Sequence, residues 1–501
     1  MKTVTGTLLR TPLTQRATAL MVGALAGLAG CASVAPTADD VASLSCTTKL
    51  QYIDRQVAQN DVRNVTAARV SGYPFLRANR NSVLMGAQIE PELSNDHNGT
   101  ELFADWLSQM RDLDRAARAA EFRNLPQSVG ITLDELEICA EQLAAELDID
   151  DYAKLAEVVF VPDDYLDFQR IAGLYPLTAF PAHFGYEGWK RDNLRSFDLA
   201  ADELQQAGPW QSYGLTGMGQ PADVKLANIN TDSFGRLLPT PSGLKALVRA
   251  YAPIFKIRTE SDSDKIGLPV LGARDALSDI DTRQSTIFYR LGHTYLNGAW
   301  HAQITYSVWF PERPATGMFD ILAGHLDALI WRVTLDHDGM PLIADSIHGC
   351  GCYHLFFPGS RLQRIAAPED GDIRETAESP TGTVDPEILA RPVLWIDAVS
   401  HYLLAITARD GQGQNEPVVT AKEMPENSLN SLMLGDGSGY ASLYDADGFV
   451  PGTDRLERFI LWPLGIERPG AMRQWGHHAT AFVGRRHFDD PLMFDRYFAV
   501  R

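Results

Sequence analysis

Basic residues are few in this sequence. Its 501 residues include 44 Lys and Arg against 64 Asp and Glu, so the formal net charge is −20 at pH 7. Such an excess of negative charge repels the phosphates of nucleic acids and anionic lipid surfaces. We therefore expect no nucleic-acid partner.

The motifs of the common nucleotide-binding and zinc enzymes are also missing. The sequence contains no Gly-x-Gly-x-x-Gly, no Walker sequence and no His-Glu-x-x-His. These motifs hold the pyrophosphate of a dinucleotide, the phosphates of a nucleotide and a catalytic zinc ion, respectively. No period of roughly 20–50 residues recurs either, which argues against a solenoid or a propeller.

No acidic residue precedes Asp39, whereas Lys2, Arg10 and Arg16 precede an apolar run over residues 17–30. A basic start followed by a short apolar run is typical of a secretory signal. The run is shorter than the roughly 20 residues that a membrane span needs. We expect residues 1–30 to be a signal peptide rather than a transmembrane anchor.

The sequence Leu28-Ala29-Gly30-Cys31 closes this run and resembles the lipobox of bacterial lipoproteins. The resemblance implies cleavage after Gly30, lipid on the Cys31 thiol, and a further acyl chain such as palmitate on the new amino terminus. Ala32 and Ser33 follow the cysteine, without the aspartate that retains lipoproteins at the inner membrane. This implies a cell-envelope protein on the periplasmic face of the outer membrane, whose lipid anchor makes the membrane its partner. The alternatives are the inner membrane, the cell surface, or a secreted protein in which Cys31 is incidental.

Hydrophobic residues make up 45% of the sequence, which is enough for sizeable cores. Residues 31–45 are rich in Ala, Ser, Pro and Asp and form a tether. Apolar residues recur at helical spacing over 46–159 and at a spacing of two, between Gly, Pro and Asp turns, over 208–501. The mixed segment 160–207 carries aromatic residues that we expect to bridge these units. The sequence predicts an α+β protein, with a helical N-terminal domain followed by a larger, mostly antiparallel β-rich domain.

Cysteine is scarce, with five residues in the whole chain. Cys46 and Cys139 each lie on the apolar face of a predicted helix, the second of which starts with the capping-box spacing Thr132-x-x-Glu135. Because the periplasm is oxidising, this placement predicts a Cys46–Cys139 disulfide. The alternative is two buried thiols.

Soft metal ligands gather near the other two cysteines. His348, Cys350, Cys352 and His354 have one parity, so a straight strand would direct them to one side. At about 3.3 Å per residue the two histidines would lie roughly 20 Å apart, so at most two or three of the four can share one ion. Three residues of neighbouring strands could complete a site: His301, His325 and Asp327. This pattern predicts a Zn or Fe site, and the alternative is core histidines with a Cys350–Cys352 disulfide.

A His-x-Asp pair with a distant histidine is the ligand set of non-haem iron oxygenases. His325 and Asp327 form such a pair, and His401 could supply the distant ligand. The strand before them places His301, Gln303, Thr305 and Ser307 on one face, which predicts either a polar cleft or a solvated sheet face. We expect any active or binding site to lie on these strands.

The register of the hairpin around residues 336–339 decides which ligands meet. If Leu335 pairs with Met340, Asp327 lies opposite His348 on the same face. If Asp336 pairs with Met340, as a type I turn with a glycine bulge prefers, these side chains point to opposite faces. We expect the second register, because it also groups the apolar residues on one face: Leu329, Trp331, Val333, Leu335, Ile343 and Ile347.

The triplet His348-Gly349-Cys350 resembles the core of L,D-transpeptidases, which cross-link peptidoglycan. The resemblance implies a Cys350 nucleophile activated by His348. Those enzymes carry an Arg two residues after the cysteine, where this chain has Cys352.

Near the C-terminus a charged cluster, which we attribute to structural ion pairs, comprises His477, His478, Arg485, Arg486, His487, Asp489 and Asp490. Three functions follow from the sequence. The first is a non-catalytic envelope lipoprotein that binds or scaffolds a partner. The second is a metal-dependent enzyme on the 301–354 strands, and the third is a cysteine acyltransferase.

Overall fold

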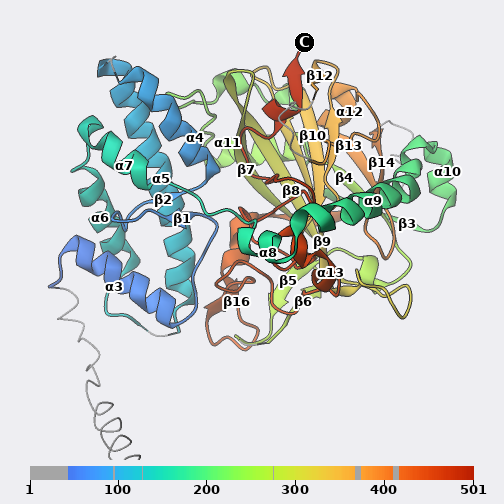
Figure 1. The fold of residues 1–501 in the computed structure, drawn as a ribbon, viewed down its shortest axis with the longest axis horizontal. Coiled ribbons are helices and arrows are strands. Elements are labelled where there is room, and N and C mark those ends of the chain that lie inside the picture. The colour runs from blue at the N-terminus through green and yellow to red at the C-terminus, as the bar shows by residue number, and fades with distance from the viewer. Residues whose placement is uncertain (1–42, 94–95, 127, 275, 367–373, 410–416) are drawn as a thin grey trace, which may run out of the picture.

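A computed structural model describes residues 43–93, 96–126, 128–274, 276–366, 374–409 and 417–501 (Figure 1). The expected signal peptide, Cys31 and most of the tether lie outside these residues. The chain forms a helical unit followed by a large, mostly antiparallel sheet, so the α+β prediction is confirmed. Within the described part, no helix combines the length and apolar character that crossing a membrane requires.

The helical unit, on the left of Figure 1, packs around Trp106, whose indole N–H donates to the carbonyl of Ser82. Its helices are α3 (Cys46–Gln59), α4 (Arg80–Ile89), α5 (Asp96–Asn124), α6 (Leu133–Ala144) and α7 (Tyr152–Val158), with 3₁₀ turns at Glu90–Glu92 and Ile149–Asp151 and a small β1 (Ala68–Arg69)–β2 (Arg77–Ala78) ladder. Thr132 and Glu135 form the expected capping box of α6.

The disulfide expected in this unit is present. The Sγ atoms of Cys46 and Cys139 lie 2.08 Å apart and join α3 to α6. A buried ion network adds to the core: Arg77 binds Asp114 and Glu121, at 3.2 and 2.7 Å. Because every member has an opposite charge within reach, these charges can remain buried.

Three helices connect the units. They are α8 (Asp167–Ala172), α9 (Tyr175–Asn193) and α10 (Ala201–Gln206), with a 3₁₀ turn at Leu194–Asp198 between the last two. In Figure 1, α9 runs across the front of the sheet. Its Trp189 side chain packs against the main core of the β domain.

Ten strands form the large sheet in the order β11-β10-β9-β8-β7-β15-β3-β4-β13-β14. They are β3 (Trp210–Leu215), β4 (Ile254–Arg258), β7 (Thr286–Leu296), β8 (Ala299–Arg313), β9 (Gly324–Leu335), β10 (Pro341–His348), β11 (Leu355–Pro358), β13 (Pro392–Ile396), β14 (Leu403–Ala408) and β15 (Val418–Pro425). Strand β15 pairs in parallel with β7 and β3, and β13 with β4; the other neighbours are antiparallel.

Shorter elements surround the sheet. They are α11 (Pro241–Ala250), α12 (Pro386–Ala390), α13 (Arg458–Leu461), a 3₁₀ turn at Trp462–Leu464, and the ladders β5 (Leu268–Leu271)–β6 (Ser278–Asp281), β12 (Leu362–Arg364)–β18 (Phe498–Val500) and β16 (Leu432–Met433)–β17 (Tyr440–Ala441). One face of the sheet, with Trp331, packs on α11 and α12. The C-terminal segment, with Phe488 and Phe494, packs on the other face.

The sequence led us to expect that the polar face of β8 forms a cleft or a solvated surface. Both expectations are wrong. His301, Gln303, Thr305 and Ser307 are all buried. Gln303 donates to the Thr334 hydroxyl of the neighbouring strand at 3.1 Å. His301 and Gln303 have hydrogen-bond partners on the neighbouring strand, and the C-terminal segment covers this face of the sheet, whereas the Thr305 hydroxyl has no partner among the described residues.

Candidate functional site

The hairpin between β9 and β10 has the expected turn and an unexpected bulge. The Asp336 N–H donates to the Met340 carbonyl at 2.9 Å, and Gly339 takes a positive φ of 82°, as the glycine-bulge register predicts. The pairing then shifts by one residue, so that Ile343 rather than Leu342 pairs with Thr334. Because one extra residue reverses the parity of the rest of β10, its side chains exchange faces beyond this point.

The bulge overturns the expected separation of Asp327 and His348. His348 pairs with Leu329, so it shares a face with Asp327, two residues away along β9. Asp327 Oδ1 and His348 Nδ1 lie 3.5 Å apart. Ile343 and Ile347 consequently lie on the opposite face from Trp331, where Ile347 packs on Phe488.

His401 joins this pair from the loop between β13 and β14. Its Nδ1 lies 2.9 Å from Asp327 Oδ2 and its Nε2 lies 3.7 Å from Asp264 Oδ1, while its ring stacks on Phe310. Burial alone would lower the pKa of His401, but its contacts with the two carboxylates outweigh burial and raise it. Arg455 also reaches Asp327, at 3.3 Å. The group is a buried ion cluster in which the carboxylates already have cationic partners.

His348 differs from His401 because burial dominates and lowers its pKa. Its ring contacts Tyr353 and Tyr402, with centroids 5.1 and 5.5 Å away. Among the described residues, its Nε2 has no hydrogen-bond partner. The adjoining void, which Trp189 of α9 helps to line, holds only about 10 Å³, roughly the space of one water molecule.

His354 does not join His348, because the chain turns after β10. The His348 N–H donates to the Cys352 carbonyl at 3.0 Å, and Gly351 takes a φ of 87°. The shared parity of a straight strand is therefore lost. His354 Nε2 instead lies 2.9 Å from Asp345 Oδ2, on the other face of the sheet, where Arg332 binds both oxygens of that carboxylate at 2.9 and 2.6 Å.

Cys350 and Cys352 are buried free thiols within this turn. The hydrogen bond with Cys350, in which the neutral Cys352 thiol is the favoured form, and then burial raise the pKa of the Cys352 thiol well above its ordinary value. A raised pKa disfavours the thiolate, which is the nucleophilic and metal-binding form of cysteine. Cys350 thus contacts Cys352, whereas His348 contacts Asp327.

The remaining ligand candidates lie apart. His325 Nε2 lies 2.7 Å from the Ser278 carbonyl, and His301 Nδ1 lies 3.3 Å from that of Leu335, at the other end of β9. Across the described ranges, no three His, Cys, Asp or Glu side chains form a group that could hold a metal ion. Of the sequence-predicted ligands the structure brings together Asp327 with His348, and Cys350 with Cys352. The distant His401 also reaches Asp327.

The C-terminal charged cluster forms ion pairs with the segment before α8. His477 lies 2.8 Å from Asp164, and His487 lies 3.0 Å from Asp163. Arg80 of the helical unit reaches Asp164 at 2.9 Å. These contacts join the helical unit to the C-terminal segment, as structural ion pairs would.

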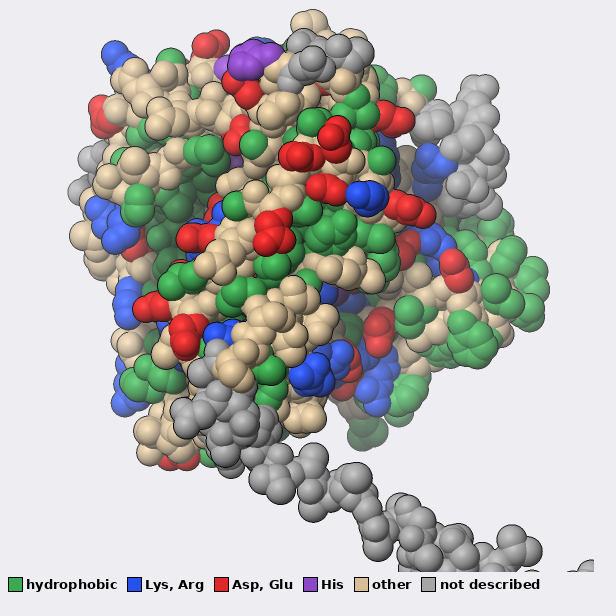
Figure 2. All heavy atoms as spheres, turned by 90° about the vertical axis from the view of Figure 1, so that its left-hand side faces the viewer, with side chains coloured by type: hydrophobic (Ala, Val, Ile, Leu, Met, Phe, Trp, Pro, Cys, Tyr) green, Lys and Arg blue, Asp and Glu red, His purple; other side chains and the backbone are tan. Residues whose placement is uncertain are grey.

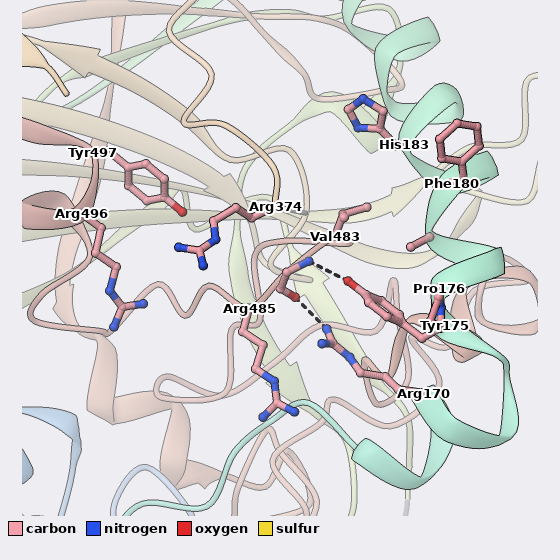
Figure 3. Close-up of a pocket in the computed structure, with 12 residues that line it drawn as sticks. Arg170, Tyr175, Pro176, Phe180, His183, Arg374, Val483, Arg485, Arg496 and Tyr497 are labelled. Carbon is pink, nitrogen blue, oxygen red and sulfur yellow. Dashed lines mark hydrogen bonds between the residues drawn. The ribbon is translucent and has the colours of Figure 1, made fainter. Parts of the chain in front are cut away.

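An accessible pocket lies beside α9, and Arg485 of the C-terminal charged cluster is one of its lining residues. It has a volume of about 650 Å³ and is lined by Arg170, Tyr175, Pro176, Ala179, Phe180, His183, Arg374, Val483, Gly484, Arg485, Arg496 and Tyr497. Figure 3 shows Arg374, Arg496 and Tyr497 on one side of it and Arg170, Tyr175 and Phe180, from α8 and α9, on the other. Its size falls within the range of small-molecule sites, about 300–1,000 Å³.

The charged side chains described in the lining of this pocket are all basic. Four arginines and no carboxylate occur among its described lining residues. Arg170 donates to the carbonyls of Leu464 and Gly484, at 2.8 and 2.7 Å, and these groups leave its positive charge uncompensated. Arg485 pairs with Asp163 and Asp167 outside the pocket, and Arg496 pairs with Asp490. We call this site the arginine pocket.

A second hollow, of about 920 Å³, lies beside the β9–β10 turn and includes His337 and Tyr251. Its charged lining has both signs: Lys225, Asp338, Asp385, Glu387, Arg391 and Arg409. Such a lining favours no ligand charge, so the arginine pocket is the sharper candidate site. Comparison of the chain with protein-family models, with curated proteins and with solved structures finds no significant match.

Proposed function

We propose that this protein is a lipid-anchored component of the bacterial cell envelope that binds an anionic ligand and does no chemistry on it. The observation that carries the binding function is the arginine pocket, with four arginines and no acidic lining residue where the chain is described. Guanidinium groups are strong, directional donors to carboxylates and phosphates. The Leu28–Cys31 lipobox supports the lipid anchor, and Ala32 and Ser33 after the cysteine, in place of a retaining aspartate, support the periplasmic face of the outer membrane.

Binding is favoured over catalysis because the candidate catalytic and metal-binding residues are buried and already contact partners within the fold. Asp327 and Asp345 are buried and already paired with cations. Cys350, the candidate nucleophile, is a buried thiol that contacts Cys352. A metal-dependent or cysteine-dependent reaction would need an open site at these residues, whereas the void beside His348 is about 10 Å³.

The anchor is tested by replacing Cys31 with Ser. We expect the variant to leave the membrane fraction and become soluble in the periplasm, because several acyl chains, each CH₂ worth about 0.8 kcal/mol when buried, provide the attachment. Fractionation with detection by antibody measures this, and Cys46→Ser, which leaves the lipobox intact, is the control. Unchanged membrane association of Cys31→Ser would exclude the lipid anchor.

Anion binding is tested by calorimetric titration with hexyl phosphate, a soluble phosphate ester. Removing one charge-assisted contact costs about 1.5–3 kcal/mol, so Arg496→Gln and Arg374→Gln should each weaken binding about tenfold or more. Arg283→Gln is the matched control, because Arg283 is exposed and pairs with Asp281 far from the pocket. Absence of binding, or equal affinity in all three variants, would contradict the proposed function.

A further inference from the structure

Large apolar side chains are exposed along α8, the turn that follows it and α9. Its members are between 60 and 81% exposed: Phe168, Ile171, Leu174, Leu177, Phe180 and Phe184. We call them the α8–α9 stripe. Within α8 and within α9 they recur every three or four residues, so they lie on one face of each helix, and Leu174 lies in the turn between the two helices. Apolar side chains protrude at the right-hand edge of Figure 2, the side on which α8 and α9 lie.

Helix α9 shows the reverse of ordinary amphipathic packing. A surface helix normally directs its apolar stripe to the core. Of the nineteen residues of α9, Ala179 alone is buried. The C-terminal half of the helix attaches to the β domain, where the Trp189 ring packs on Tyr353 and Tyr402, with centroids 4.8 and 5.7 Å away. The described part of the chain therefore does not cover the apolar face of α9.

The apolar surface extends beyond the stripe onto α13. Phe459 and Ile460 are 64 and 61% exposed. The turn that follows α13 packs on α8, since a Cβ atom at Gly173 would collide with Pro463. Contiguous apolar patches of this kind mark interaction sites with membranes or other proteins.

The stripe and the arginine pocket share a wall. Phe180 belongs to the stripe and lines the pocket, and Pro176 and Tyr175 of the same helix line the pocket beside it. A ligand with an anionic group and an apolar tail would satisfy both surfaces at once. Phospholipids have this chemistry, with a phosphate joined to acyl chains.

We propose that this surface docks onto a phospholipid bilayer, with the α8–α9 stripe inserted among the acyl chains and a lipid phosphate in the arginine pocket. The inference rests on the proposed function, because it names the ligand of the same pocket. Phe, Leu and Ile beside arginines are typical of segments that lie in a membrane interface. A protein partner would need no phosphate site, so the charge of the pocket favours lipid.

The net charge of −20 does not prevent this contact. At physiological salt, charges more than about 8 Å from the lipid are largely screened, so the local arginines dominate. The proposed lipid on Cys31 also keeps the bilayer close. Twelve residues lead from Cys31 to Ser43, the first described residue, and can span at most about 40 Å.

The test is co-sedimentation with vesicles of phosphatidylethanolamine and phosphatidylglycerol, using the Cys31→Ser protein so that the anchor does not contribute. We expect reversible binding at high lipid concentration, too weak to keep the Cys31→Ser protein on membranes during fractionation. Binding should fall roughly tenfold for each side chain removed in Phe168→Ser and Leu177→Ser. Neither residue lines the arginine pocket. The matched controls are Val83→Ser and Ile138→Ser, which remove exposed apolar side chains from α4 and α6 and should bind as before.

The outcomes separate this inference from the proposed function. Stripe variants that keep hexyl phosphate binding and an unchanged melting temperature but lose vesicle binding support docking. Vesicle binding that is unchanged in the stripe variants overturns docking, even if hexyl phosphate still binds. A wild-type dimer that becomes a monomer in the stripe variants, without vesicle binding, overturns it in favour of a second copy as the occupant. Vesicle binding that Arg496→Gln leaves unchanged would remove the phosphate from the proposal.

Discussion

Replacing Arg332 with Ala is expected to lower the free energy of unfolding by about 3–5 kcal/mol, because it leaves an unpaired charge in the interior. Arg332 and Asp345 are both fully buried, and the guanidinium binds both carboxylate oxygens. Arg332 also donates to the Phe488 carbonyl and stacks on the Phe488 ring, 3.6 Å from its centroid. The substitution therefore also weakens the attachment of the C-terminal segment to the sheet.

Urea denaturation at pH 7 measures this effect. Arg283→Ala is the matched control, since its carboxylate partner is also an aspartate but Arg283 is 88% exposed, and no measurable change is expected there. A double variant, Arg332→Met with Asp345→Leu, should recover part of the loss, because it leaves no charge unpaired but removes the acceptor of the buried His354 ring N–H. If Arg332→Ala changed stability as little as Arg283→Ala, the pair would have no structural importance.

Patterns that depend on neighbouring residues could be predicted from the sequence. Thr132 and Glu135 form the α6 cap through contacts within one turn. The Cys46–Cys139 disulfide followed from two helices whose apolar faces must meet. The Asp336–Met340 pairing followed from the turn sequence. In each case the interaction depends on local periodicity or on a single contact between faces.

Asp327, His348 and His401 were candidates from the sequence, but which candidates meet could not be predicted, because each contact depends on an event that local pattern does not encode. One inserted residue at Leu342 changes the face of His348 and brings it to Asp327. No residue type marks a bulge of this kind. The parity argument for His354 failed likewise, because it assumed a straight strand where a turn through Gly351 intervenes.

The arginine pocket was missed because its residues are far apart in sequence. Arg170 precedes the β domain in the sequence and Arg496 lies near the C-terminal end of that domain. The two residues come together only in the folded protein. The expectation that the aromatic residues of segment 160–207 bridge the two units is correct for only some of them. Trp189 bridges to the core as expected, whereas Phe168 and Phe180 are exposed. Aromatic side chains in a helix have the same periodicity whether the protein or a membrane covers them.

A second large effect is expected in acid, where stability should depend on buried neutral histidines. Burial, and after it nearby cationic groups, lowers the pKa of His354 and of His478 to about 3. For His354 the neutral ring suits its site, since Nε2–H can donate to Asp345 and Nδ1 can accept from the Thr480 hydroxyl. In the unfolded chain a histidine has a pKa near 6.5. The unfolded state therefore binds the extra proton between about pH 6.5 and 3, and stability present above pH 6.5 is lost as the pH falls.

Each of these histidines should remove about 2 kcal/mol of stability at pH 5 relative to pH 7, by linkage. Urea midpoints at pH 7 and pH 5 measure this in the wild type, in His354→Gln and in His478→Gln. In each variant the loss of stability between the two pH values should be smaller than in the wild type by about that amount.

His401 and His477 have contacts with carboxylates that outweigh burial and raise their pKa, so they favour the folded state as the pH falls. This contribution is the same in all three proteins and cancels in the comparison. The exposed His97 provides the control, because His97→Gln should keep the wild-type pH dependence. Equal pH dependence in His354→Gln and the wild type would mean that His354 takes up its proton in the folded protein, with Asp345 as its counter-ion.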